Sequence, residues 1–255
     1  MIKKISLISA VVMVTSVWGI EIKGASHAVD VAGKQRMFTQ RMLKDYAMVG
    51  MKNSFGNPLE DLKKIMAEFE SASGALKAYT TDKEIQKSIT KMEALWQPIQ
   101  EVLSQEAKKE KVGKLQEDLE ALLKVADDTT KLFSKASGKE SGEVVNMAGR
   151  QRMLSQRMAS LYMLKVWGID DPQFGKKMDK AMDLFKSSLE TLQKSQLNTE
   201  DINRLLTKVK RSFLFFEMMN KSKSKFIPTL IYKKSNDILV NMNSVTQAYV
   251  ALETK

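Results

Sequence analysis

Residues 32–42 read AGKQRMFTQRM, and residues 148–158 read AGRQRMLSQRM. The two segments lie 116 residues apart, counted from Gly33 to Gly149, and they differ only by exchanges between similar residues. A repeat of this length has the size of a small domain and is too long for the stacked units of a solenoid. The chain of 255 residues is therefore interpreted as two copies of one module, and the duplicated segment is the first place to look for function.

The rest of each module has the pattern of an all-α protein. Prolines number only four, and apolar residues recur at helical spacing, as in Leu62, Ile65 and Phe69. An N-cap residue followed by proline predicts helix starts at Asn57-Pro58 and at Asp171-Pro172. Capping boxes are predicted for the next helix of each module, at Thr81 with Glu84 and at Asn198 with Asp201.

These helix-start signals and the apolar spacing predict four amphipathic helices in each module. Helices of about twenty residues joined by short turns predict an up-down four-helix bundle. We assign the first module to residues 29–136, a small-residue linker to residues 137–143 and the second module to residues 144–255. The alternative for the linker is a brief break within one long helix.

The N-terminus reads as a secretory leader. Lys3 and Lys4 precede an apolar stretch at residues 5–20, and Ser26-His27-Ala28 offers small residues before a cleavage site. We therefore expect a signal peptide at residues 1–28 and a periplasmic mature protein. An uncleaved anchor is the alternative. The chain has no cysteine, which excludes disulfides and a lipoprotein anchor attached through cysteine.

Composition argues against several classes of function. The formal net charge is +11, but the lysines are spread among glutamates rather than interleaved with aromatic residues, so nucleic acid is not an expected partner. His27 is the one histidine and leaves with the leader, and no nucleophile–base pair or phosphate loop appears. We expect a non-enzyme without a cofactor. The 17 methionines suggest either adaptable core packing, which we favour, or a Cu(I) carrier.

The repeated segment carries the candidate site. On a helix, Arg36 lies on one face with Gln40, and Arg152 with Gln156. A guanidinium fork fits a planar oxyanion, and two facing guanidiniums would repel by about 3 kcal/mol at about 6 Å. An anion between them would relieve that repulsion. The alternative is that both arginines bond helix ends or glutamates of neighbouring helices. The candidate ligand-binding residues are Arg36, Arg152, Gly33, Gly149, Gln40 and Gln156.

Other residues of the segment have simpler interpretations. Gly33 and Gly149 sit early in a strong helix, where glycine costs up to about 1 kcal/mol, so another helix or a ligand is expected close to the backbone. Arg41 has Asp45 at i+4 as a local partner, whereas Arg157 has none. We interpret this second pair of arginines as structural.

The two segments resemble the signature of the PilJ/NarX-type periplasmic sensor module, which occurs on nitrate/nitrite sensor kinases and type IV pilus chemotaxis transducers. The second copy is the closer match, and the first departs at Lys34 and Phe38. The resemblance implies a four-helix bundle for each half. It also implies that nitrate lies between the first helices of a dimer, held by one arginine from each subunit. Carried over, those arginines are Arg36 and Arg152, with Gly33 and Gly149 as close backbone neighbours.

The resemblance, together with the repeat, leads to a functional hypothesis. We expect a free-standing tandem whose two bundles form an intramolecular dimer with a pseudo-two-fold axis. It would bind a small inorganic anion, nitrate or nitrite, and report to a separate membrane-bound sensor kinase or chemoreceptor. The alternative is a ligand-free helical interaction protein that docks on a pilus or chemoreceptor component. The aromatic run at residues 213–216 is dense enough to leave a contact patch for such a partner.

Overall fold

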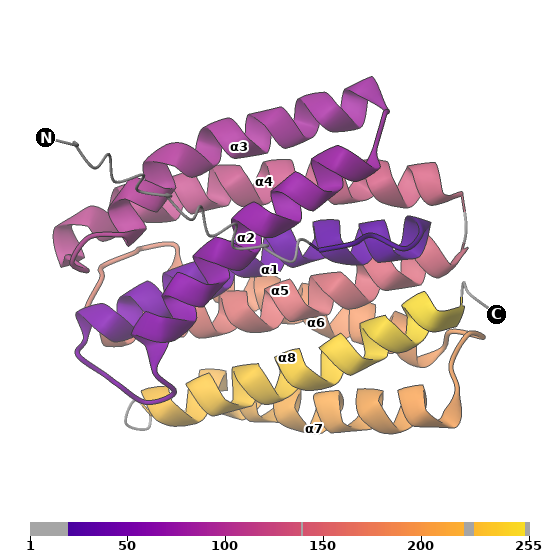
Figure 1. Cartoon of the computed structure of the whole chain (residues 1–255). Helices are drawn as coiled ribbons and strands as arrows, with labels where there is room; N and C mark the ends of the chain where they lie inside the picture. Colours follow the sequence, from indigo (N-terminus) through magenta and orange to yellow (C-terminus); the bar gives the residue numbers. More distant parts are fainter. Residues whose placement is uncertain (1–19, 139, 222–226, 253–255) are drawn as a thin grey trace, which may run out of the picture.

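Eight α-helices in two groups of four make up the part of the chain that the computed structural model describes, residues 20–138, 140–221 and 227–252 (Figure 1). The first group comprises α1 (Ala25–Gly50), α2 (Pro58–Tyr79), α3 (Lys83–Leu103) and α4 (Val112–Ser137), with a 3₁₀ turn at Lys109–Lys111 before α4. The second comprises α5 (Glu140–Val166), α6 (Phe174–Gln193), α7 (Glu200–Lys221) and α8 (Pro228–Ala251). The predicted all-α class, built from helical bundles, is confirmed.

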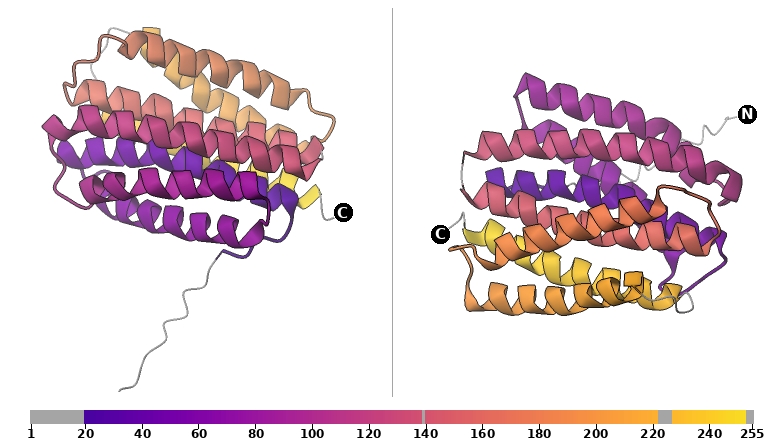
Figure 2. Two further views of the ribbon diagram at one scale, coloured as in Figure 1. Left: turned by 90° about the horizontal axis from the view of Figure 1, so that it is seen from above. Right: turned by 180° about the vertical axis from the view of Figure 1, so that it is seen from behind.

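The first helix of each group lies at the centre of the molecule. Figure 1 shows α1 and α5 side by side, with α3 and α4 above them, α7 and α8 below, and α2 crossing obliquely in front. The helices α1 and α5 form the most extensive contact between any two of the described helices. Within the groups, α1 packs against α2 and α4, and α5 packs against α6 and α8. Seen from behind, α6 crosses α5 obliquely (Figure 2). The repeated motif thus lies where the two modules meet.

The central helices differ from the outer ones in how they are buried. On α3 a stripe faces the core at spacings of three and four residues, including Ile85, Ile89, Met92 and Trp96, as expected of a surface helix. In contrast, α1 and α5 are buried nearly all round, with polar as well as apolar side chains inside. Buried polar groups must find hydrogen-bond partners, so these two helices carry the polar chemistry of the molecule.

Two of the predicted helix starts in the first module differ in their caps. The helix α2 begins at Pro58 as predicted, but the Asn57 side chain makes no capping hydrogen bond. The N-cap of α3 is Asp82, not Thr81. One carboxylate oxygen of Asp82 accepts hydrogen bonds from the backbone N–H groups of Glu84 (2.8 Å) and Ile85 (3.1 Å).

The second module shows shifts of the same kind. The helix α6 begins at Phe174, two residues beyond Pro172, because the Asp171 carboxylate accepts from the Gln173 N–H (2.8 Å) in a turn that precedes the helix. The predicted cap Asn198 instead donates to the Leu192 carbonyl (2.8 Å), and the Thr199 hydroxyl accepts from the Ile202 N–H (3.3 Å). Competition between neighbouring Asp, Asn and Thr side chains moves a cap by one or two residues.

The connection between the modules is shorter than predicted. The helix α4 ends at Ser137, Gly138 has a left-handed backbone (φ 59°), and α5 already begins at Glu140. Residues 140–143 of the expected linker therefore belong to α5. The chain reverses direction at this point (Figure 1), so the alternative of one long interrupted helix is wrong.

Most of the expected leader, residues 1–19, lies outside the described residues. Its last part does not: α1 begins at Ala25, and Ser26 and Ala28 are buried in its first turn. The Ser26 hydroxyl lies 3.0 Å from that of Ser141 on α5. Within the described residues, we find no helix with the length and apolar character needed to span a bilayer.

Candidate functional site

The site is centred on the closest approach of α1 and α5, where two glycines face each other. A Cβ placed on Gly149 would lie 3.9 Å from the Gly33 Cα, and it would lie 3.1 and 3.2 Å from the terminal nitrogens Nη2 of Arg36 and Arg152. A Cβ on Gly33 would meet the same two nitrogens at 3.2 and 3.5 Å. The close neighbour predicted for each glycine is therefore the other helix, together with both guanidinium groups.

This packing leads to a mutational prediction. We expect Gly149→Ala to lower the free energy of unfolding by about 1–2 kcal/mol, because a methyl group would crowd two buried guanidiniums. The control Gly74→Ala adds the same methyl in α2, where nothing lies within 4 Å of the new Cβ, and should raise stability by about 0.5–1 kcal/mol. Urea unfolding of both variants measures the difference. A stabilising Gly149→Ala would show that the approach is not as close as described.

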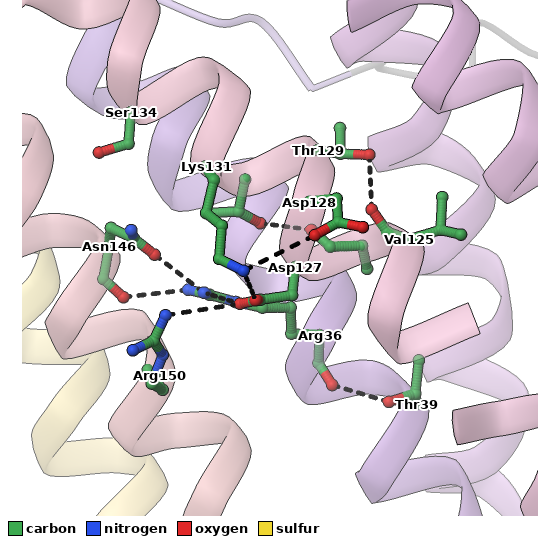
Figure 3. Close-up of polar contacts among 12 residues, drawn as sticks. Arg36, Thr39, Val125, Asp127, Asp128, Thr129, Lys131, Ser134, Asn146 and Arg150 are labelled. Carbon is green, nitrogen blue, oxygen red and sulfur yellow. Dashed lines mark hydrogen bonds and ion pairs between the residues drawn. The ribbon is translucent and has the colours of Figure 1, made fainter. Parts of the chain in front are cut away.

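Arg36 extends from α1 between α4 and α5 (Figure 3). Its side chain is fully buried. The Nη1 group donates to an Asp127 carboxylate oxygen and to the Asn146 side-chain oxygen, both at 2.8 Å, and Nη2 donates to the Asn146 carbonyl at 3.0 Å. Arg36 therefore joins α4 of its own module to the first helix of the other module.

Arg152 makes the reciprocal set of contacts from α5. It is also fully buried, and its Nη2 lies 2.7 Å from a carboxylate oxygen of Asp30 on α1. Its Nη1 donates to the Asn243 side-chain oxygen on α8 at 3.1 Å. Arg152 therefore joins α8 of its own module to the first helix of the first module.

The partners of the two arginines are exchanged between the modules. Asp30 corresponds to Asn146 across the 116-residue repeat, and Asp127 corresponds to Asn243. As a result, among the described residues each arginine has one carboxylate and one amide: Arg36 takes its carboxylate from its own module, and Arg152 from the other. The sequence led us to expect two guanidiniums that repel each other without a balancing charge. The structure differs, because each guanidinium has a carboxylate at ion-pair distance.

The ionisation of the cluster agrees with these contacts. Burial alone would raise the pKa of Asp30, but the ion pairs with Arg152 and Lys34 hold the pKa of this carboxyl below its ordinary value. Burial would likewise raise the pKa of Asp127, but the contacts with Arg36 and Lys131 outweigh it and lower this pKa. Burial lowers the pKa of Arg36 to about 10 although Asp127 opposes the shift, so this arginine stays charged at neutral pH.

Some polar atoms of the repeated segment have no hydrogen-bond partner. Among the described residues they include the buried Nε atoms of Arg36 and Arg152 and the side-chain oxygens of Gln35 and Gln151. The amide nitrogens of these glutamines are occupied: Gln35 donates to the Phe69 carbonyl (3.0 Å), and Gln151 to the Phe185 carbonyl (3.1 Å). Each glutamine thus ties the central helix to the second helix of its own module, a role that helical spacing alone did not reveal.

The structure does not place Gln40 and Gln156 against the two guanidiniums. Both are buried one turn further along their helices. Gln40 donates to Glu120 at 3.2 Å, and Gln156 donates to the Ser235 carbonyl at 3.1 Å and accepts from Lys44 at 2.9 Å. The hydrogen bonds described for the two glutamines are thus with other residues.

The second pair of arginines joins helices within and between the modules, which is a structural role. Arg41 forms a two-pronged pair with Asp61 of α2 (2.9 and 2.6 Å), not with the predicted Asp45. Arg157 pairs with Glu120 of α4 at 2.9 Å. The methionines of the motif, among them Met42 and Met158, lie in the apolar core, in line with the packing interpretation.

A second buried polar cluster lies further along α1. Lys44 is fully buried, donates to Gln156 and to Asn236 (3.0 Å), and lies 3.7 Å from a carboxylate oxygen of Asp45. Burial, aided by the neighbouring Asp61 and opposed by Lys44, raises the pKa of Asp45 well above its ordinary value. In the second copy, the uncharged Ser160 and Leu161 occupy the positions that correspond to Lys44 and Asp45. This difference between the copies was the sequence signal for the cluster.

Comparison with known proteins places the chain in a family. A family model described as the N-terminal part of type IV pili methyl-accepting chemotaxis transducers, PilJ, matches residues 21–127 and 134–212. No curated protein and no solved structure matches the chain. The two matched segments follow the tandem arrangement of the modules, and the domain is a sensory, chemoreceptor-associated helical module. The chain belongs to the PilJ family, with its signature present in both halves.

Proposed function

We propose that the protein is an exported, non-enzymatic sensory module that signals to a separate membrane-bound chemoreceptor or sensor kinase. In this proposal the two bundles reproduce, within one chain and around a pseudo-two-fold axis, the dimer of a receptor's sensory domain. The observation that carries it is the reciprocal bridging by two buried arginines. Arg36 reaches Asn146 in the second module, and Arg152 reaches Asp30 in the first.

The arginine contacts give the modules a defined relative position. The bonds of Arg36 to Asp127 and of Arg152 to Asn243 lie within a module, so they can move with it. The bonds to Asn146 and Asp30 cross the interface and would break if α1 shifted along α5. Since a buried charge without a partner is costly, the interface favours discrete arrangements over continuous sliding. A change between such arrangements is the signal that we propose.

A contact surface for the partner is available on the second module. Of the aromatic run at residues 213–216, Phe213 and Phe216 are buried, but Leu214 is 47% exposed and Met218 on the same helix is 69% exposed. A photoreactive residue in place of Leu214 or Met218 tests the proposal in the source bacterium. We expect an adduct identified by mass spectrometry as a chemoreceptor or sensor kinase. Adducts confined to unrelated proteins would contradict the proposed partner.

A second candidate is the binding of nitrate or nitrite between Arg36 and Arg152. It is favoured by the unpartnered Nε atoms and by the convergence of both Nη2 groups on the glycine contact. Such an anion would have to compete with Asp30 and Asp127, which already balance the arginines. If the site exists, nitrate at about a hundred times its Kd should stabilise the fold by about 2.7 kcal/mol. Calorimetry without heat for either anion would exclude this candidate and leave the signalling proposal standing.

Export is part of the proposal and has its own test. Because Ser26 and Ala28 are buried in the first turn of α1, we place the cleavage ahead of Ala25 rather than after Ala28. Mass spectrometry of the periplasmic protein should give an N-terminus that lies after the apolar stretch at residues 5–20 and no later than Ala25. An intact Met1 would identify an anchor instead, and cleavage after Ala28 would show that the first turn of α1 is dispensable.

A further inference from the structure

An open cavity of about 580 Å³ lies between α4, α5 and α6, outside the buried arginine cluster. Most of the residues that line it are polar, and they include basic and hydroxyl side chains, among them Lys131, Lys135, Arg150, Ser134, Ser187 and Thr191. Figure 3 shows Lys131, Ser134, Asn146 and Arg150 grouped beside the Arg36–Asp127 pair. A cavity of this volume is in the range of sites for small organic ligands and is far larger than nitrate requires.

The charges around the cavity are unequal. Three cationic side chains line it, against one carboxylate, Glu143. Lys131 binds Asp127 at 2.6 Å and Asp128 at 3.6 Å, and Arg150 lies 3.7 Å from the same Asp127. Asp127 is therefore shared by Lys131, Arg150 and the buried Arg36, which leaves positive charge in excess on the cavity side.

The corresponding place in the other half of the molecule has fewer cationic side chains. There Asp30 is bound by Arg152, by Lys34 (3.4 Å) and by the uncharged Gln247 (2.8 Å). Gln247 stands 116 residues after Lys131, so Lys131 has no cationic counterpart at this position of the second copy.

We propose that this cavity binds a small organic anion that carries a carboxylate or a phosphate together with several hydroxyl groups. Arg150, Lys131 and Lys135 would hold the anionic group, since an arginine fork and lysine ammoniums form charge-assisted bonds to either oxyanion. Ser134, Ser187 and Thr191 would meet the hydroxyl groups of the ligand. The inference goes beyond the proposed function, because the cavity lies beside the arginine cluster and not between the two arginines.

The position of the cavity also connects it to the interface of the modules. Asp127 faces Arg150 and Lys131 on one side and Arg36 on the other, and Asn146 lines the cavity while accepting from Arg36. An anion that binds Lys131 and Arg150 weakens their hold on Asp127 and leaves this carboxylate to Arg36. Occupancy of the cavity thereby changes the ion pairing of Arg36 at the contact of α1 with α5.

Isothermal titration of the full mature chain tests the site with named probes. We expect heat with at least one of galacturonate, gluconate and glucose 6-phosphate, and none with sulfate or inorganic phosphate. Binding of either of the first two probes but not of the third would identify a carboxylate as the recognised group. The reverse result would identify a phosphate ester. Arg150→Gln and Lys135→Gln should each weaken binding about tenfold or more. The control Lys87→Gln, which removes an exposed charge on α3, should leave it within about twofold.

A second measurement does not depend on the variants. Met147 lines the cavity, so its methyl resonance, assigned with Met147→Leu, should shift on addition of the same probe. Absence of heat and of a Met147 shift with all three organic probes would overturn the proposal. Equal binding by inorganic anions, or unchanged affinity in both Arg150→Gln and Lys135→Gln, would overturn it as well. None of these outcomes affects the signalling proposal, whose test is the receptor adduct.

Discussion

Arg152→Met should lower the free energy of unfolding by about 3–5 kcal/mol at neutral pH, because it leaves the fully buried Asp30 without its arginine. Lys34 and Gln247 keep their contacts with this carboxylate but lie on its other oxygen. If the two guanidiniums were instead unbalanced and repelled each other, removing one of them would stabilise the fold. The matched control Arg157→Met removes a partly exposed pair with Glu120 and should cost about 1 kcal/mol or less.

The pH dependence of the same variant provides a second check. In the unmodified chain the pKa of Asp30 is lowered on folding, so this group contributes stability above its unfolded pKa, and that stability is lost as pH falls. Without Arg152, burial dominates and the pKa of Asp30 should rise, so acidification should now favour folding at this group. Urea unfolding between about pH 4 and 7 measures both slopes. A variant as stable as the unmodified chain, with the same pH slope, would contradict the role of the pair.

Asp30→Asn should have the second large effect. It keeps the shape of the side chain but leaves Arg152 buried with two amides and no carboxylate, so we expect a loss of about 3 kcal/mol. A small anion can then take the place of the lost carboxylate, and added nitrate should restore part of the stability. The control Asp128→Asn removes an exposed carboxylate and should change stability by less than about 0.5 kcal/mol. Equal responses of the two variants to nitrate would argue against a specific effect.

The position of the site could be predicted from the sequence because it depends on the repeat and on helical periodicity. Both bring Arg36, Arg152, Gly33 and Gly149 to the same face of equivalent helices, and the structure places all four at one contact. Helical spacing was less informative for Gln40 and Gln156. A residue at i+4 shares a face but lies one turn along the axis, which is enough for these side chains to meet Glu120 and Lys44 instead.

The partners of the arginines could not be predicted from local pattern. Asp127 and Asn146 lie 91 and 110 residues from Arg36, and no spacing rule connects residues on different helices at such separations. A signal was nevertheless present in the aligned copies. Asp30 stands opposite Asn146, and Asp127 opposite Asn243, so the two copies exchange Asp and Asn twice and in the same sense, with both aspartates in the first copy.

This exchange makes the two modules complementary rather than interchangeable. A symmetric pair of first modules, in the same arrangement, would give each Arg36 two carboxylates, Asp127 and the Asp30 of the other copy. A symmetric pair of second modules would give each Arg152 two amides and no carboxylate. The first pair would carry excess buried negative charge, and the second would need an external anion. One module of each kind balances both arginines, as the chain provides.

The central claim is that each buried arginine needs one carboxylate, whichever neighbour supplies it. Two double variants with the same composition and net charge test it: Asp30→Asn with Asn243→Asp, and Asp30→Asn with Asn146→Asp. The first returns a carboxylate to Arg152 from α8, and its unfolding free energy should stay within about 1 kcal/mol of the unmodified chain. The second moves the carboxylate to Arg36 and should be less stable than the first by about 3 kcal/mol. Equal stabilities of the two variants in urea unfolding, or the reverse order, would contradict the account.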